Sequence, residues 1–231
     1  MSTRIPPRST STYQALFDGK TLNGWKYQPG LWSVNVDENI IIAKSTNPVL
    51  ESTYCLTNKD DFTDFRLLIT VKLVESEMHS GISFWGYVPP EQHNNKYGYA
   101  GHLVMFPSFW GVFDLLPSPK KAGAHVGRNL IYIDPGKIAR KTGKQHDWNE
   151  LEILAKGNHL RVACNGVMIV DWKDPEPERI RPAPIGLQLH SNNVPQEVHF
   201  KNIYIEEFPS LDELITVNNN NNNNRRNTSK L

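Results

Sequence analysis

The sequence predicts an all-β protein, built as a two-sheet antiparallel β-sandwich. Apolar and polar side chains alternate over several runs, and the longest places on one face Phe65, Leu67, Ile69, Val71 and Leu73. Asn165-Gly166 lies between two further alternating runs, and both residues tolerate the positive φ of a type I′ hairpin turn. No segment keeps apolar residues at helical spacing over three turns. Many short strands separated by Gly, Pro, Asn and Asp favour a sandwich, although alternation alone does not separate it from a closed barrel.

The expected strands follow one another through the middle of the chain. They cover residues 32–36, 40–43, 65–73, 81–87, 101–106, 112–116, 129–133, 148–155, 160–164, 167–170, 185–190 and 198–208. One short helical turn is expected at 210–215.

Both ends of the chain have the composition of unstructured segments. We expect a disordered leader at 1–12, one sandwich domain at 13–209, and a disordered asparagine-rich tail at 210–231. A homopolymeric asparagine run such as 218–224 cannot bury apolar surface.

The bulk composition excludes several function classes. The net charge of +1, with scattered Lys and Arg, argues against nucleic-acid binding. The two cysteines, Cys55 and Cys164, are expected to be buried thiols rather than a disulfide framework. No apolar run reaches the ~18 residues of a membrane span, and the polar first residues do not form a secretory signal. We therefore expect a cytoplasmic protein with no membrane partner.

Specific motifs in the first half point to a family. The segment 16–25, Leu-Phe-Asp-Gly-Lys-Thr-Leu-Asn-Gly-Trp, reads as a strand, an Asp-Gly turn and a tryptophan anchored beneath it. Trp-Ser-Val at 32–34, Asp-Phe-Thr-Asp-Phe at 61–65 and Ser-Gly-Ile at 80–82 follow. This series resembles the 3-keto-disaccharide hydrolase domain family, long described only as a domain of unknown function.

The second half resembles the same family more closely, and the resemblance spans residues 15 to 208. The matching motifs occur at 113–117, 148–150, 155–158, 165–167, 185–190 and 198–203, in the family's order. Many of them are turn or core residues. The resemblance therefore implies a concanavalin-like jelly roll more firmly than it implies an activity.

The resemblance implies cleavage of glycosides whose sugar carries a ketone at carbon 3. The ketone acidifies the carbon-2 proton, so that a base can remove it and the enolate can expel the glycosidic oxygen from carbon 1. Water then adds back. This route requires a general base and an electrophile near the enolate oxygen. It does not require the paired carboxylates of an ordinary glycosidase.

Strand 185–190 supplies the first expected site residues. Leu187 and Leu189 point one way, so that Gln188 and His190 point the other way, onto the open face. His190 matches the family's Leu-Gln-x-His motif and is the first candidate for a catalytic group. Gln188 is expected to bind sugar hydroxyls, although an ordinary surface histidine would also fit the pattern at His190.

Strand 101–106 departs from the family. Members usually carry a glutamate, and a glutamine two residues later, on the open face, and here we align those positions with His102 and Val104. The arginine commonly found after Ser-Gly-Ile is also missing, and Phe84-Trp85 stand near its place. His102 is expected to serve as a base. The expected aromatic residues of an open, sugar-stacking face are Trp85, Tyr87, Phe106 and Trp110.

Asp114 is a further catalytic candidate and His79 a further substrate-binding candidate. No pair of histidines has a recognised ligand spacing, so we expect no cofactor, although the resemblance leaves room for a divalent cation. Two hypotheses follow: a 3-keto-glycoside hydrolase or lyase, and a carbohydrate-binding sandwich that has lost the chemistry. A protein-interaction sandwich is the third reading. The expected partner is a small carbohydrate.

Overall fold

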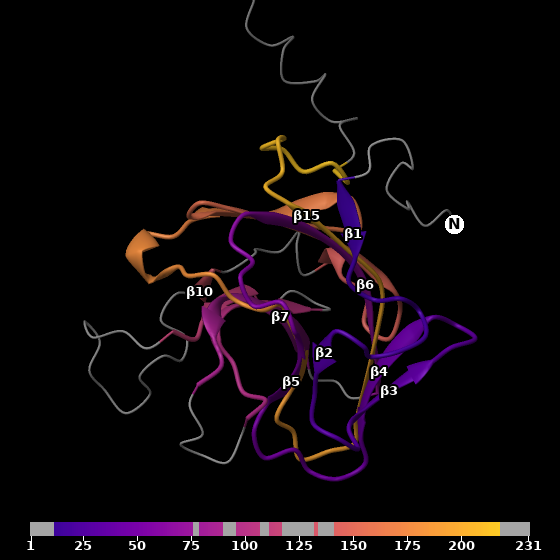
Figure 1. The fold of residues 1–231 in the computed structure, drawn as a ribbon. Coiled ribbons are helices and arrows are strands. Elements are labelled where there is room, and N and C mark those ends of the chain that lie inside the picture. Colours follow the sequence, from indigo (N-terminus) through magenta and orange to yellow (C-terminus); the bar gives the residue numbers. More distant parts are fainter. Residues whose placement is uncertain are drawn as a thin grey trace, which may run out of the picture.

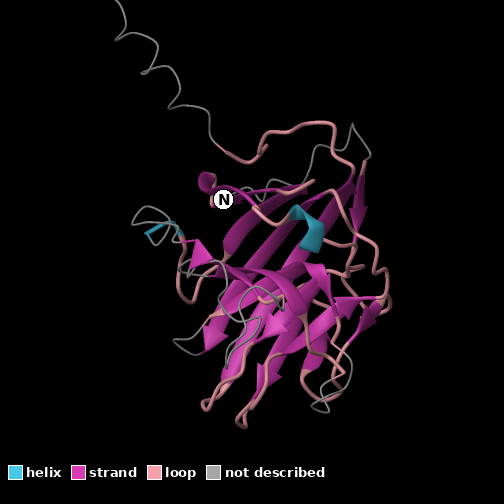
Figure 2. Cartoon of the chain, turned by 90° about the vertical axis from the view of Figure 1, so that its left-hand side faces the viewer, coloured by secondary structure: helices cyan, strands magenta, loops and turns pink. Residues whose placement is uncertain are grey.

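A computed structural model describes residues 12–75, 79–89, 96–106, 111–116, 132–133 and 141–217. Two antiparallel sheets are stacked face to face with separate edges, so the described part of the chain is a sandwich and not a closed barrel (Figure 1). Strands make up nearly all of its regular structure (Figure 2). The predicted fold class is confirmed. No described helix is long and apolar enough to cross a bilayer.

The first sheet has eight strands among the described residues. Its order is β13-β12-β11-β6-β15-β4-β3, and β1 adds to β15. The strands are β1 (Tyr13–Ala15), β3 (Trp32–Asn35), β4 (Ile40–Ser45), β6 (Phe65–Glu75), β11 (Asn149–Lys156), β12 (His159–Cys164), β13 (Val167–Lys173) and β15 (Gln196–Glu207).

The second sheet has seven strands in the same part of the chain, in the order β10-β9-β8-β7-β14-β5-β2. They are β2 (Trp25–Lys26), β5 (Thr53–Thr57), β7 (Ser80–Tyr87), β8 (Ala100–Phe106), β9 (Gly111–Asp114), β10 (Tyr132–Ile133) and β14 (Gly186–Leu189). A 3-10 turn, Pro177–Arg179, precedes β14.

The main core lies between the sheets and follows the predicted alternation. The apolar face of β6, from Phe65 to Leu73, is buried in it. Asn165 and Gly166 take φ angles of 48° and 81°, which confirms the predicted hairpin turn between β12 and β13. A bulge in β15 gives Asn202 a φ of 52° and keeps both Phe200 and Ile203 in the core.

The Asp-Gly turn at the start of the domain is also as predicted. Asp18 Oδ1 accepts hydrogen bonds from the backbone N–H groups of Lys20 and Thr21, at 2.7 Å each. The indole of Trp25 is buried beneath the turn and donates to the carbonyl of Leu16 at 2.8 Å. Both cysteine thiols are buried and free, and burial raises the pKa of Cys164 to about 12.

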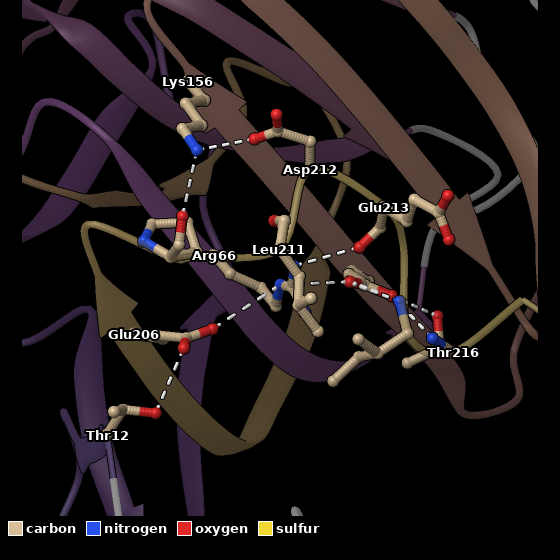
Figure 3. Close-up of polar contacts among 11 residues, drawn as sticks. Thr12, Arg66, Lys156, Glu206, Leu211, Asp212, Glu213 and Thr216 are labelled. Atoms are coloured by element: carbon tan, nitrogen blue, oxygen red, sulfur yellow. Dashed lines mark hydrogen bonds and ion pairs between the residues drawn. The ribbon is translucent and has the colours of Figure 1, made fainter.

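The segment 208–217, which we call the C-terminal strap, crosses the outer face of the eight-stranded sheet (Figure 3). Arg66 Nη2 donates to the carbonyls of Leu211 and Glu213 at 2.9 and 3.0 Å. The buried carboxylate of Glu152 accepts the backbone N–H groups of Ile215 and Thr216 at 3.0 and 2.8 Å. The packed domain therefore extends beyond 209, where we expected it to end, and the predicted helical turn at 210–215 is wrong.

Candidate saccharide site

The outer face of the seven-stranded sheet carries a second buried cluster, separate from the main core. Strand alternation decides which side chains belong to it: Leu187 and Leu189 of β14 enter the core, so Gln188 faces outward. The register pairs Gln188 with Tyr54 of β5, and Gln188 Nε2 donates to the Tyr54 hydroxyl at 2.9 Å. Figure 1 shows β5 and β7 in this layer, opposite β15 and β6.

The neighbouring strands complete the outer face. Gly186 is paired with Ser83 of β7, and Ser83 with Leu103 of β8. Tyr99 covers this region: its hydroxyl donates to the Pro184 carbonyl at 2.7 Å. The buried members of the cluster are Tyr54, Leu56, Tyr99, Leu103, Met105 and Ala183, with Phe113 and Leu115 packed against them. The face is therefore polar on β5, β14 and β7, and apolar on β8 and β9.

Glycine is required where Tyr99 approaches the sheet. A Cβ added at Gly101 would lie 2.5 Å from Tyr99 Cε1 and 2.7 Å from the Phe84 carbonyl oxygen. Any side chain at this position would push Tyr99 off the outer face.

Two buried side-chain oxygens on the outer face have no hydrogen-bond partner among the described residues. They are Ser83 Oγ and Gln188 Oε1, and the Gln188 side chain belongs to a residue that is 2% exposed. Leaving such an atom buried and unpaired costs about 1–3 kcal/mol. They lie on the adjacent strands β7 and β14.

His190 and His79 lie at one end of the polar half of the outer face, which is formed by β5, β14 and β7. Continuing the pairing of β14 with β7 places them opposite each other, and their ring centroids are 4.3 Å apart. His190 Nδ1 lies 2.6 Å from the Ser191 carbonyl oxygen and so carries a proton, which leaves Nε2 as the basic atom of the neutral ring. Burial lowers the pKa of His79 to about 4, and the neighbouring charge of His190 acts in the same direction. His79 is therefore neutral near pH 7.

We expect an NMR pH titration to show His79 unprotonated down to about pH 5. Because its pKa is lower in the folded than in the unfolded state, the unfolded chain binds the extra proton between pH 6.5 and 4. The contribution of His79 to folding stability is therefore present above about pH 6.5 and is lost as the pH falls toward 4. A His79 midpoint near 6.5 in the folded protein would contradict this environment.

His102 does not lie on the open face, contrary to our prediction. Val104 and Phe106 of the same strand are core residues, and His102 shares their side of the sheet with an exposed fraction of 0%. Its Nε2 is 2.7 Å from Oδ2 of Asp174, which is also buried and follows β13 of the opposite sheet. The outward residues of β8 are Leu103 and Met105. The two positions that we aligned with the family's outward pair, His102 and Val104, therefore face the core in this chain.

Trp85 is also in the interior rather than on the open face. A bulge between Phe84 and Tyr87 gives Trp85 a φ of 51° and turns both Phe84 and Trp85 into the core. The Trp85 indole donates to the Thr63 carbonyl at 2.7 Å. The sheet thus separates His190 from both His102 and Trp85, and the predicted grouping of these three residues is wrong.

The remaining predicted site residues are dispersed. Tyr87 is partly buried, with the Arg181 guanidinium 5.4 Å from its ring centroid. The backbone of Asp114 pairs with that of His102 in the β8–β9 ladder. Trp110 lies outside the described residues, as does the side chain of Asp114. Sequence reasoning missed Tyr54, Ser83 and Tyr99, although the Gly-x-Ser spacing at 81–83 placed Ser83 outward once Ile82 was assigned to the core.

No group of three or more His, Cys, Asp or Glu side chains that could hold a metal occurs within the described ranges. The site consists instead of hydroxyl, amide and imidazole groups beside an apolar surface. Such groups exchange hydrogen bonds with hydroxyls and pack against C–H faces.

The fold is that of a concanavalin-like sandwich, and the sequence relates it to one family. Residues 12–206 match the 3-keto-alpha-glucoside-1,2-lyase-like domain, and the chain belongs to this family. Among curated proteins, none has a sequence that matches the chain.

Solved structures share this fold at low identity. One is a protein of Parabacteroides distasonis ATCC 8503, provisionally named a glycosyl hydrolase, with a TM-score of 0.58 and 19% identity over 85% of this chain and 94% of its own. Another from the same organism has a TM-score of 0.54 and 18% identity, over 85% and 99%. Carbohydrate-binding module CBM66 of Bacillus subtilis has a TM-score of 0.50 and 12% identity, over 80% and 96%. The fold is thus shared by proteins named as glycan-acting and as carbohydrate-binding.

Proposed function

We propose that the chain binds a saccharide on the outer face of its seven-stranded sheet, over β5, β14 and β7. The observation that carries the proposal is the pair of buried, unpartnered oxygens, Ser83 Oγ and Gln188 Oε1. Sugar hydroxyls would supply the missing hydrogen bonds and recover the free energy that these atoms lose on burial. Both atoms lie on rigid neighbouring strands, which hold them without a ligand.

The two halves of the outer face fit the two kinds of surface on a sugar ring. The amide of Gln188 and the hydroxyls of Ser83 and Tyr54 are suited to the hydroxyl edge. Leu103 and Met105, which are buried in the same cluster, would contact the C–H groups of a bound sugar. None of these five side chains carries a charge, so this face suits a neutral ligand.

Binding is favoured over catalysis because the outward positions of β8 are apolar. The family's glutamate and glutamine would face outward on this strand, and the outward residues here are Leu103 and Met105. The base that we predicted at His102 lies on the opposite side of the sheet. The family's usual polar pair is thus absent from the described outer face.

Replacing Gln188 by methionine tests the binding site. Methionine keeps the volume and removes both polar atoms, including the unpaired Oε1. We expect about a tenfold or greater loss of saccharide affinity, while the free energy of unfolding changes by no more than about 1 kcal/mol. Screening on an array of mono- to hexasaccharides, followed by calorimetry on the ligands found and on 3-keto-trehalose, measures the affinity. Urea unfolding measures the stability.

Gln14→Met is the matched control, because Gln14 is exposed on β1 of the other sheet. It should change neither quantity. Unaltered affinity in Gln188→Met, or binding of no saccharide by the unmodified chain, would overturn the proposal.

A second candidate function is the elimination itself, and the adjacent histidines His79 and His190 favour it. The neutral imidazole of one of them would take the carbon-2 proton of a 3-keto-glycoside. The electron pair forms the enolate, the bond from carbon 1 to the glycosidic oxygen breaks, and the leaving oxygen takes up a proton. Water then adds its oxygen to carbon 1 and a proton to carbon 2, so that the net reaction is hydrolysis.

Turnover of 3-keto-trehalose by the unmodified chain, compared with single His190→Ala and His79→Ala variants, tests this candidate. We expect the variant that lacks the base to lose at least about a hundredfold in rate, as removal of a general base does. His199→Ala is the control histidine, since His199 lies in β15 of the opposite sheet beside Glu197. Binding without turnover would reject elimination and leave saccharide binding intact.

A further inference from the structure

A groove opens at one end of the sandwich, next to the site already described but separate from it. Two cavities of about 460 and 530 Å³ lie between residues 28–33 and 44–51, and both are lined by Leu31, Ser45 and Asn47. Because they share these walls, we treat them as one space, the loop groove. Each cavity is within the ~300–1,000 Å³ range of small-molecule sites.

The larger cavity combines unpaired polar groups with an apolar wall. Its side chains of Gln28, Asn47, Glu51 and Lys96 form no hydrogen bond or ion pair with the described part of the chain. The wall includes Leu31, Pro48, Val49 and Leu50, and Leu50 is 86% exposed. One carboxylate and one ammonium group balance each other, so the lining carries no net charge and suits a neutral ligand.

Trp32 is a buried residue in the wall of the smaller cavity. This residue lines the cavity, is only 6% exposed, and stacks on Phe200 with a ring-centroid distance of 6.2 Å. Its indole Nε1 is buried and has no acceptor among the described residues. Buried indole N–H groups usually find a partner.

The loop groove adjoins the outer face of the seven-stranded sheet. Tyr97, which lines the larger cavity, accepts a backbone hydrogen bond from Tyr54 at 2.8 Å. Val49, another lining residue, exchanges backbone hydrogen bonds of 2.8 Å with Asn192, two residues after His190. A ligand that fills the polar half of the outer face therefore ends next to the groove.

We infer that the loop groove is a second saccharide subsite, which receives the far sugar units of an oligosaccharide whose first units lie on the outer face. The inference rests on the proposed saccharide binding and adds the ligand class: an oligosaccharide of three or more units rather than a mono- or disaccharide. The amides of Gln28 and Asn47 bind hydroxyls, and Leu31 and Leu50 contact the ring.

The test compares affinities for each array-selected oligosaccharide and its own disaccharide fragment, measured by calorimetry on the full chain. The unmodified chain should bind the longer ligand at least tenfold more tightly. A groove variant, Asn47→Ala/Lys96→Ala, should lose this preference and keep its disaccharide affinity. The control, Asn58→Ala/Lys20→Ala, replaces exposed residues that do not line either cavity and should keep the preference.

The outcomes separate this inference from the proposed function. Retention of the length preference in the groove variant, or equal affinity for both ligands, would overturn the groove subsite alone. Both the outer-face site and the groove subsite are supported if Gln188→Met loses disaccharide binding and only the groove variant loses the preference for the longer ligand. An effect of the groove variant without any effect of Gln188→Met would reject the outer face, and with it the inference that one ligand spans both places.

Discussion

Replacing Arg66 by methionine should lower the free energy of unfolding by about 3–5 kcal/mol, the usual cost of breaking a buried ion pair from one side. Arg66 and Glu152 are 1% and 0% exposed, with Arg66 Nε 3.4 Å from Glu152 Oε1. The substitution leaves the Glu152 carboxylate buried without its cation. It also removes the two hydrogen bonds that hold the C-terminal strap at Leu211 and Glu213. Guanidinium unfolding measures the change.

Lys156→Met, in β11, is the control for a surface contact to the same strap. Lys156 pairs with Asp212, which is 66% exposed, and such surface pairs contribute about 0–1 kcal/mol. Amide hydrogen exchange should also show faster exchange of the Ile215 and Thr216 N–H groups in Arg66→Met. A loss no larger than that of Lys156→Met would contradict the role of Arg66 as the anchor of the strap.

Asp174→Ala should cost about 3 kcal/mol, because it leaves His102 buried between the sheets without its partner. The other ring nitrogen of His102, Nδ1, is buried and has no hydrogen-bond partner among the described residues. After the substitution neither ring nitrogen would have one. The matched control is Asp171→Ala, which breaks a second His–Asp pair, His159–Asp171, in which the aspartate is 52% exposed. That change should cost less than about 1 kcal/mol.

The same pair makes stability depend on pH in a stated direction. Burial alone would raise the pKa of Asp174, but the hydrogen bonds from His102 and from the Glu176 N–H lower it below its usual value of 3.8. The folded state therefore binds the proton less readily than the unfolded state. The contribution of Asp174 is present above about pH 5 and is lost as the pH falls below 3.8. Unfolding at pH 3 to 6 should show a shallower pH dependence in Asp174→Asn than in the unmodified chain.

The strands with one buried face were predictable from sequence because their side chains alternate. β6 and β15 follow this pattern, and their core residues were assigned correctly. β5 was missed because all five of its residues are buried, so that Thr53–Thr57 shows no polar face. Its outward residues, Tyr54 and Leu56, are covered by the cluster around Tyr99.

The directions of the candidate site's side chains were predicted correctly where the alternation was unambiguous. They were predicted wrongly where the strand was irregular. Leu187 and Leu189 fixed the outward direction of Gln188, and His190 follows from the same alternation. In β7 the bulge after Phe84 reversed Trp85, and Gly86, which lies inside the bulge, is the sign of it in the sequence that the prediction overlooked. In β8 every residue from Ala100 to Phe106 is buried, so polarity gave no indication of which face looks outward. His102 was assigned to the wrong side because we aligned it with the family's outward glutamate.

The most direct test of the account is a map of the ligand on the protein. Backbone ¹H–¹⁵N spectra of the full chain, titrated with the array-selected saccharide, report which amides change environment. We predict the largest shifts at Ser83 and Gln188 and their strand neighbours, with none at Thr70 or Lys201 on the outer face of the other sheet. Shifts confined to the eight-stranded sheet, or unchanged positions at Ser83 and Gln188 under saturating ligand, would contradict it.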